Sequence, residues 1–285
     1  MNENLPLKAL VIRDWLRDAA GQLANAGISS AKLDAEIILS HTLRQSRTYL
    51  HAHDDELVSV RHVEIADARL QLRLDRTPIA YIVGHKEFYG RLFKVNPATL
   101  IPRPESETII TILKELTAQT AINLSQSPPR LVDIGTGSGC LGITAKLEMP
   151  ELEVTLVDVS RQALRVAETN AKELHAEVIM TRSDLLHSYP FVADYIVANL
   201  PYVDPEWERS PETNYEPALA LFAADDGLAL INKLLQQAPL HLKSGGYILL
   251  EADPRQHAAI IKTAKGHQFV LHEARDFIVT LRKAT

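Results

Sequence analysis

The sequence contains a single cysteine, Cys140, in 285 residues. One thiol cannot form a disulfide within the chain, so a reducing compartment such as the cytoplasm is expected. No stretch approaches the roughly 18 consecutive apolar residues of a membrane-spanning helix. The N-terminal segment carries Glu3, Lys8, Arg13 and Asp14 and does not look like a signal peptide. These absences predict a cytoplasmic protein that makes no contact with a membrane.

Positive charge is not in excess. Lysine and arginine number 30 against 36 aspartates and glutamates, so the formal net charge is -6. A protein that binds a nucleic-acid duplex usually carries a basic face, because phosphate neutralisation supplies much of its affinity. The acidic balance therefore argues against nucleic acid as the main partner. His51 and His53 lie beside Asp54 and Asp55 with no further cysteine or histidine at ligand spacing, so no metal site is predicted.

The N-terminal part predicts a small helical bundle over residues 1–77. Apolar residues recur at helical spacing from Leu7 to Trp15, and Gly27 is typical of a helix end. A further helix is expected over 58–74, because Pro78 can end it.

Residues 78–104 predict a β-hairpin that links this bundle to a larger domain over 105–285. Tyr81, Val83 and Phe93 are strand formers, and Tyr89-Gly90-Arg91 supplies a turn.

The larger domain alternates strand and helix patterns. Such units build a mainly parallel sheet with helices on both faces, which is an α/β fold. The last two strands are too close in sequence for a helix between them, so they are expected to form a hairpin at an antiparallel edge. The expected strands are 131–134, 154–157, 178–181, 195–198, 247–251, 269–272 and 277–281.

A glycine-rich loop follows the first of these strands. Leu131–Ile134 runs straight into Gly135-Thr136-Gly137-Ser138-Gly139. Ligands of open α/β sheets bind beyond the carboxyl ends of the strands, and glycine lets the backbone approach them closely. Gly137, Gly139 and Gly142 also satisfy the G-x-G-x-x-G pattern of nicotinamide cofactors, so the loop alone leaves the ligand open.

Three aspartates at strand ends favour S-adenosylmethionine. Asp133 would repel a pyrophosphate but attract the ammonium of S-adenosylmethionine. Asp158 can accept hydrogen bonds from both ribose hydroxyls, and Asp184 can accept one from the adenine amino group, with Leu185 beside the ring. Any one aspartate could simply cap a helix, but three together favour the cationic ligand. The predicted cofactor-binding residues are Asp133, Gly135, Thr136, Gly137, Ser138, Gly139, Asp158, Asp184, Leu185 and Asn199.

The predicted catalytic residues are Asn199, Leu200, Pro201 and Tyr202, directly after the fourth strand. A primary amide nitrogen is a poor nucleophile, so a site must hold its two N–H groups with acceptors and align it with the methyl donor. The Asn199 side-chain oxygen and the Leu200 carbonyl can be these acceptors, because Pro201 keeps Leu200 extended. Tyr202 can pack flat against the amide. A strand that ends in an ordinary Asn-x-Pro turn is the alternative.

Four motifs make the chain similar to the family of release factor glutamine methyltransferases. They are Phe88-Tyr89-Gly90 with Phe93-Lys94-Val95, Leu100–Glu107, Asp133–Gly139, and Tyr215-Glu216-Pro217 with Asp226-Gly227-Leu228. The resemblance implies a seven-stranded, Rossmann-like class I methyltransferase domain with a helical N-terminal domain. It also implies methyl transfer from S-adenosylmethionine to the glutamine of the Gly-Gly-Gln loop of peptide chain release factors, which would be the protein partners of a monomer.

The chain departs from this family's pattern at two positions. Leu200 stands where the family's tetrapeptide Asn-Pro-Pro-Tyr has its first proline, and Asp253 replaces the glycine of a Glu-x-Gly-x-x-Gln element. Leu200 motivates one alternative, a cofactor-binding module that has lost turnover. A second alternative is an adenine-N6 methyltransferase, because an exocyclic amine also needs two acceptors and a flat packing partner.

Overall fold

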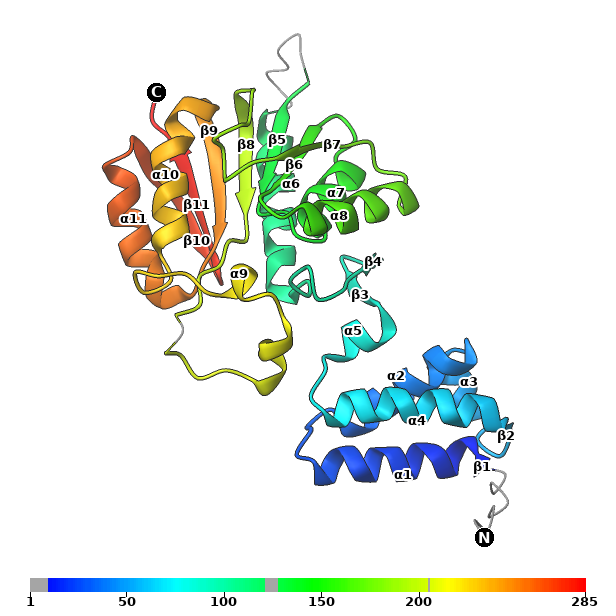
Figure 1. Ribbon diagram of the computed structural model, residues 1–285. Helices are drawn as coiled ribbons and strands as arrows, with labels where there is room; N and C mark the ends of the chain where they lie inside the picture. The colour runs from blue at the N-terminus through cyan, green and yellow to red at the C-terminus, as the bar shows by residue number, and fades with distance from the viewer. Residues whose placement is uncertain (1–9, 121–127, 205) are drawn as a thin grey trace. The chain divides into compact units, whose positions relative to one another are not determined.

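The computed structural model of the protein describes residues 10–120, 128–204 and 206–285 (Figure 1). The chain forms two compact units. One comprises Met1–Gly84 together with Ser210–Tyr215, and the other His85–Arg209 together with Glu216–Thr285. The domain limits 77 and 104 stay predictions.

The first unit is a helical bundle whose core contains Trp15, Leu23, Ile38, Leu39 and Leu50. Its helices are α1 (Ile12–Asn25), α2 (Ala31–Leu43), α3 (Arg47–Ala52), α4 (Val60–Leu74) and α5 (Ile79–Val83), and β1 (Leu10–Val11) pairs with β2 (Leu57–Val58).

Helix α5 corrects the expectation that Tyr81 and Val83 lie in a strand. The helix begins after Pro78, which has a fixed φ, and ends at Gly84, whose φ is +79°. The apolar residues between them therefore form one helical turn. Residue types that favour strands do not prevent so short a helix.

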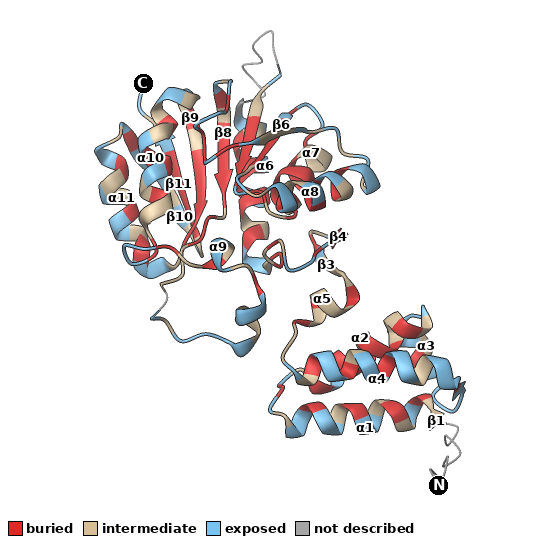
Figure 2. Cartoon of the chain, viewed as in Figure 1, coloured by how far each residue is buried: buried red, intermediate tan, exposed pale blue. Residues whose placement is uncertain are grey.

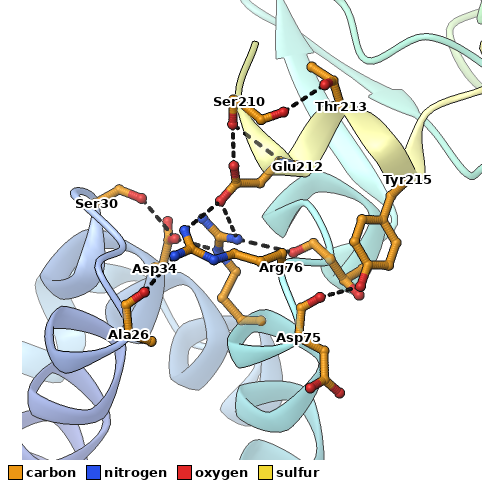
Figure 3. Close-up of polar contacts among 11 residues, drawn as sticks. Ala26, Ser30, Asp34, Asp75, Arg76, Ser210, Glu212, Thr213 and Tyr215 are labelled. Atoms are coloured by element: carbon orange, nitrogen blue, oxygen red, sulfur yellow. Dashed lines mark hydrogen bonds and ion pairs between the residues drawn. The ribbon is translucent and has the colours of Figure 1, made fainter. Parts of the chain in front are cut away.

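A segment from much later in the sequence completes the helical unit (Figure 3). In the short 3-10 helix Pro211–Tyr215, Glu212 accepts hydrogen bonds from Arg73 at 3.1 Å and Arg76 at 3.4 Å. Arg73 is buried and its Nε also donates to Asp34 at 2.7 Å. The Tyr215 hydroxyl donates to the Asp75 carbonyl. The buried guanidinium of Arg73 thus has two carboxylate partners, one of them in the late segment.

The second unit begins with a tight β-hairpin, β3 (His85–Phe88) and β4 (Arg91–Lys94). Tyr89 and Gly90 both have positive φ, at 50° and 72°. Two-residue turns with positive φ at both positions match the twist of the strands they join. Phe88 and Phe93 are buried and pack edge to face, with ring centroids 6.1 Å apart. The expected turn is therefore confirmed, in a hairpin shorter than the segment 78–104.

A seven-stranded sheet forms the centre of the second unit, so the α/β prediction is confirmed (Figure 1). The strands are β5 (Arg130–Ile134), β6 (Glu153–Asp158), β7 (Ile179–Arg182), β8 (Ala193–Ala198), β9 (Leu242–Glu251), β10 (Phe269–Arg275) and β11 (Ile278–Lys283). Their order is β10-β11-β9-β8-β5-β6-β7.

The antiparallel strand is β11, and it lies one place in from the edge rather than at it. β11 pairs antiparallel with both β9 and β10. Ile278, Val279 and Leu281 of β11 are all buried, whereas in β10 only the first residue, Phe269, is buried. The terminal hairpin therefore forms the antiparallel edge that the sequence predicts, with its more apolar strand, β11, in the inner position and β10 outermost.

Helices cover both faces of this sheet, and the strands between them are buried (Figure 2). The helices are α6 (Glu107–Thr120), α7 (Cys140–Glu148) and α8 (Arg161–Glu173) on one face, α10 (Ala229–His241) and α11 (His257–Lys265) on the other, and the short α9 (Ala218–Leu221). Alternate residues of β5 serve the two cores, since Leu131 packs with the first helices and Val132 with the second. Within the described ranges no helix is long and apolar enough to span a bilayer.

Candidate active site

A cavity of about 570 Å³ opens at the carboxyl ends of β5, β6 and β8. This volume lies within the range of roughly 300–1,000 Å³ that is usual for small-ligand pockets. The cavity brings together most of the residues that the sequence singled out. Its lining includes Asp133, Gly135, Thr136, Gly137, Ser138, Asp158, Asp184, Leu185, Asn199, Leu200 and Pro201.

Gly139 and Tyr202 do not belong to the cavity lining. Gly139 has a φ of +83°, and a Cβ there would lie 2.6 Å from the Ile143 side chain of α7. The glycine therefore lets α7 start close beneath the loop. Gly135 is the position at which the backbone turns beside the cavity, with a φ of +70°, and Leu200 lies 3.0 Å from where its Cβ would be.

Asp133 is a buried carboxylate with one oxygen left unpaired. Its Oδ2 accepts from the Thr136 hydroxyl at 2.6 Å and from the Gly142 amide at 2.9 Å. Its Oδ1 is buried and has no hydrogen-bond partner among the described residues. Burial raises the pKa of Asp133 to about 6, against the lowering effect of these two donors. A buried, unpaired carboxylate oxygen is costly, and a cationic ligand would relieve that cost.

Asp158 and Asp184 lie at the ends of the next two strands and differ in how far their carboxylates are engaged. Asp158 accepts from the Gly137 amide at 3.0 Å and from the Ser160 amide at 2.8 Å, and burial raises its pKa. Asp184 is exposed and pairs with Lys233 at 2.5 Å. Asp158 therefore ties the glycine loop to β6, while Asp184 lies at the rim.

The tetrapeptide Asn199–Tyr202 leaves β8 along the cavity wall. The Asn199 Nδ2 donates to the Ser106 hydroxyl at 3.0 Å. The Leu200 side chain is buried over the glycine loop. Tyr202 is held at two points, because its hydroxyl donates to Glu251 Oε1 at 3.0 Å and its carbonyl accepts from Gln256 Nε2 at 2.9 Å. Burial raises the pKa of Tyr202, which keeps its hydroxyl protonated.

Sequence reasoning did not assign a role to Ser106, Glu251 or the pair formed by Arg103 and Glu216. Arg103 binds Glu216 Oε1 at 2.6 Å, and the Ile101 amide binds Glu216 Oε2 at 3.1 Å. The Leu100–Glu107 and Tyr215–Pro217 motifs are thus joined through one carboxylate. The motifs themselves were visible in the sequence, but their pairing across more than 100 positions was not.

Cys140 also lines the cavity, and burial raises the pKa of its thiol to about 12. It is therefore protonated at neutral pH and is no nucleophile there.

Two family models match the chain. The model described as "PrmC N-terminal domain" matches residues 14–84, and the model described as "Methyltransferase small domain" matches residues 114–213. The two matches fall on the helical bundle and on the glycine loop with the tetrapeptide, respectively.

Curated relatives cover most of the chain. A release factor glutamine methyltransferase of Koribacter versatilis is 35% identical over 86% of this chain and 89% of its own length. The Escherichia coli protein of the same name is also 35% identical, over 86% of this chain and 87% of its own length. A bifunctional methyltransferase of Rickettsia bellii is 33% identical, and this chain spans only 51% of that longer protein.

Solved structures share the fold at low sequence identity. A methyltransferase from Pyrococcus furiosus has a TM-score of 0.52 at 17% identity, covering 77% of this chain and 98% of its own. A ribosomal RNA methyltransferase from T. thermophilus, solved with AdoMet and guanosine, has a TM-score of 0.52 at 15% identity, covering 70% of this chain and 50% of its own. These likenesses support the class I methyltransferase fold.

Proposed function

The chain belongs to the family of release factor glutamine methyltransferases, and we propose that it methylates the side-chain amide of the glutamine in the Gly-Gly-Gln motif of peptide chain release factors. S-adenosylmethionine is the methyl donor of this reaction. One observation carries the proposal: Asp133, whose Oδ1 has no hydrogen-bond partner among the described residues, and Asn199 line the same cavity. This supports a site for the cation next to a site for the acceptor amide.

The residues of the cavity fit this cofactor. The buried Asp133 Oδ1 lacks a partner among the described residues and suits an ammonium group, and Gly135 and Gly137 add no side chains to the cavity wall. Asp158 and Asp184 would accept hydrogen bonds from the ribose and the adenine, with Leu185 against the ring. The bound cofactor supplies an electrophilic methyl group on a positively charged sulfur.

The tetrapeptide would hold the acceptor. Asn199 Oδ1 and the Leu200 carbonyl accept one hydrogen bond each from the glutamine amide, which aligns its nitrogen with the methyl group. Pro201 keeps Leu200 extended, and Tyr202 packs against the amide plane. No general base is needed before transfer, because the amide proton becomes acidic only afterwards. Rate enhancement then comes from alignment and from exclusion of water.

The release factor is the proposed protein partner, and the cytoplasm, where such factors act, is the proposed compartment. We propose that the protein acts as a monomer.

Mass spectrometry of a release factor after incubation with the protein and S-adenosylmethionine tests this function. One methyl group is expected on the Gly-Gly-Gln glutamine, and none on a release factor that carries Ala in place of that glutamine. A methyl group on adenine in added RNA or DNA, with none on the release factor, would overturn the proposal in favour of an adenine-N6 methyltransferase. Cofactor binding without transfer to either would indicate a module that has lost turnover.

A further inference from the structure

Glu251, the last residue of β9, is a buried carboxylate beside the tetrapeptide. Only 1% of it is exposed, although it does not line the cavity. Tyr202 donates its hydroxyl to Oε1 at 3.0 Å, and Ser106 donates its hydroxyl to Oε2. Burial raises the pKa of Glu251, while hydrogen bonds from Ser106, Tyr202 and Asn199 lower it and the charge of Glu105 raises it further. A carboxylate buried this deeply needs such donors to remain charged.

The bond to Ser106 determines what Ser106 can offer to Asn199. A serine hydroxyl has one hydrogen, and here that hydrogen is directed at Glu251. Toward Asn199, Ser106 can then act only as an acceptor. This requirement matches the bond from Asn199 Nδ2 to Ser106 Oγ at 3.0 Å. With its nitrogen turned to Ser106, the Asn199 amide has its oxygen free to accept.

We propose that Glu251 is a positioning residue for methyl transfer, which through Ser106 turns the Asn199 amide oxygen toward the acceptor glutamine and directly holds the Tyr202 hydroxyl. This inference rests on the proposed function, since it explains how two of the acceptor-binding residues are oriented. It adds a requirement beyond the presence of the tetrapeptide: the side-chain amide of Asn199 must keep its oxygen, not its nitrogen, facing the substrate.

The substitution Glu251→Gln would reverse the orientation of the Asn199 amide. A glutamine keeps the size of Glu251 but offers one acceptor and one donor group instead of two acceptors. If its nitrogen faces Ser106, the serine hydrogen turns to Asn199 and every group stays bonded. If its nitrogen faced Tyr202 instead, the buried phenol hydrogen would be left without a partner, which is costly. The arrangement with the glutamine nitrogen facing Ser106 is therefore the more stable one. In it, Asn199 presents its own N–H groups to the N–H groups of the substrate amide.

Removing Ser106 has a smaller effect by the same reasoning. In Ser106→Ala the Glu251 carboxylate keeps its hydrogen bonds from Tyr202 and Asn199. The carboxylate therefore still attracts the amide nitrogen and repels the amide oxygen. A purely space-filling role gives the opposite order, because Glu251→Gln conserves volume whereas Ser106→Ala leaves a small void.

Kinetics of the two variants against wild type test the proposal. We expect Glu251→Gln to lower kcat for release factor methylation about 10- to 100-fold, as is usual when a supporting hydrogen bond to an active-site group is lost. The KM for the release factor and the affinity for S-adenosylmethionine should stay within about twofold. We expect Ser106→Ala to lower kcat by less than about fivefold. Glu148→Gln, whose carboxylate pairs with Arg91 and Lys114 outside the site, is the matched control and should leave kcat unchanged.

Neutron diffraction of crystals of wild type and Glu251→Gln reads the Asn199 amide directly and does not depend on which substrate is methylated. The expected result is Nδ2 toward Ser106 in wild type and Oδ1 toward Ser106 in the variant. An unchanged amide in Glu251→Gln, or a kcat lowered more by Ser106→Ala than by Glu251→Gln, would overturn the proposal. Absence of release factor methylation by wild type would instead refute the proposed function.

Discussion

The buried carboxylate of Asp133 should make cofactor binding depend on pH. Its pKa rises from 3.8 to about 6 because burial disfavours the charged form. In the cofactor-free protein this group is ionised above pH 6 and protonated below it. A shift of about 2 units corresponds to about 3 kcal/mol, because each unit is worth 1.36 kcal/mol. Since the folded-state pKa is raised, this cost to stability is absent below pH 4, grows between pH 4 and 6, and is full above pH 6.

Asp133→Asn removes both the charge and the titration. The new amide oxygen can still accept from Thr136 and Gly142, while the amide nitrogen, buried without a partner, costs about 1–3 kcal/mol. The cofactor-free variant at pH 8 should therefore be no less stable than wild type, with a gain of up to about 2 kcal/mol. Its affinity for S-adenosylmethionine should fall at least about tenfold, because the ammonium loses its counter-charge.

Calorimetric titrations and urea denaturation between pH 5 and 8 measure these effects. Wild-type affinity for S-adenosylmethionine should fall about tenfold for each pH unit below 6. It should also fall above about pH 7.7, where the free amine of the ligand loses its proton. The affinity of Asp133→Asn should be flat between pH 5 and 7. Equal affinities of wild type at pH 5 and 7, or wild-type affinity in the variant, would refute this reasoning.

Three further substitutions address the tetrapeptide and the helical unit. Leu200→Pro should raise kcat by up to about fivefold, because it restricts the loop and keeps the carbonyl; a loss of kcat in steady-state assays would argue otherwise. Gly227→Ala should cost about 2–4 kcal/mol in urea denaturation, because its Cβ would lie 2.0 Å from the Tyr202 carbonyl oxygen at a φ of +82°, and an unchanged midpoint would contradict this. Glu212→Gln should cost about 1–3 kcal/mol at pH 7, where the carboxylate that binds Arg73 is charged. Burial would raise the pKa of Glu212, but hydrogen bonds from Ser210 and Arg73 lower it to about 2. The stability difference between wild type and Glu212→Gln should therefore vanish as pH falls from 4.5 toward 2. A difference that stays constant over this range would contradict the pairing.

The sheet could be read from the sequence because its strands are short apolar runs between helical patterns. Leu131–Ile134, for example, lies within the strand Arg130–Ile134. Short elements were harder. Helix α3 has only 6 residues and no repeating pattern, so it was missed. The inner position of β11 could not be predicted, because the apolar patterns of β10 and β11 do not indicate which of the two strands is more buried.

The part of the candidate site next to the glycine loop could be proposed from the sequence because its residues follow one another in the chain. The Asp133–Gly139 stretch and the Asn199–Tyr202 tetrapeptide each combine a strand end with polar groups. The proposed positioning role of Glu251 could not be predicted from the sequence, because its hydrogen-bond partners Ser106 and Tyr202 lie 145 and 49 positions away in the chain. The role of a buried carboxylate depends on its hydrogen-bond donors, and here only the tertiary fold brings those donors next to it.

Single-turnover methyl transfer by Asn199→Ala, compared with wild type at saturating S-adenosylmethionine, tests most directly whether the acceptor amide is held by Asn199. The rate of glutamine methylation on the release factor should fall about 100-fold or more, as for the loss of one fixed hydrogen-bonding group in an active site. Affinity for the cofactor, measured by calorimetry, should change by less than about threefold. A variant that methylates the glutamine at nearly the wild-type rate would contradict the assignment of the acceptor site to this tetrapeptide.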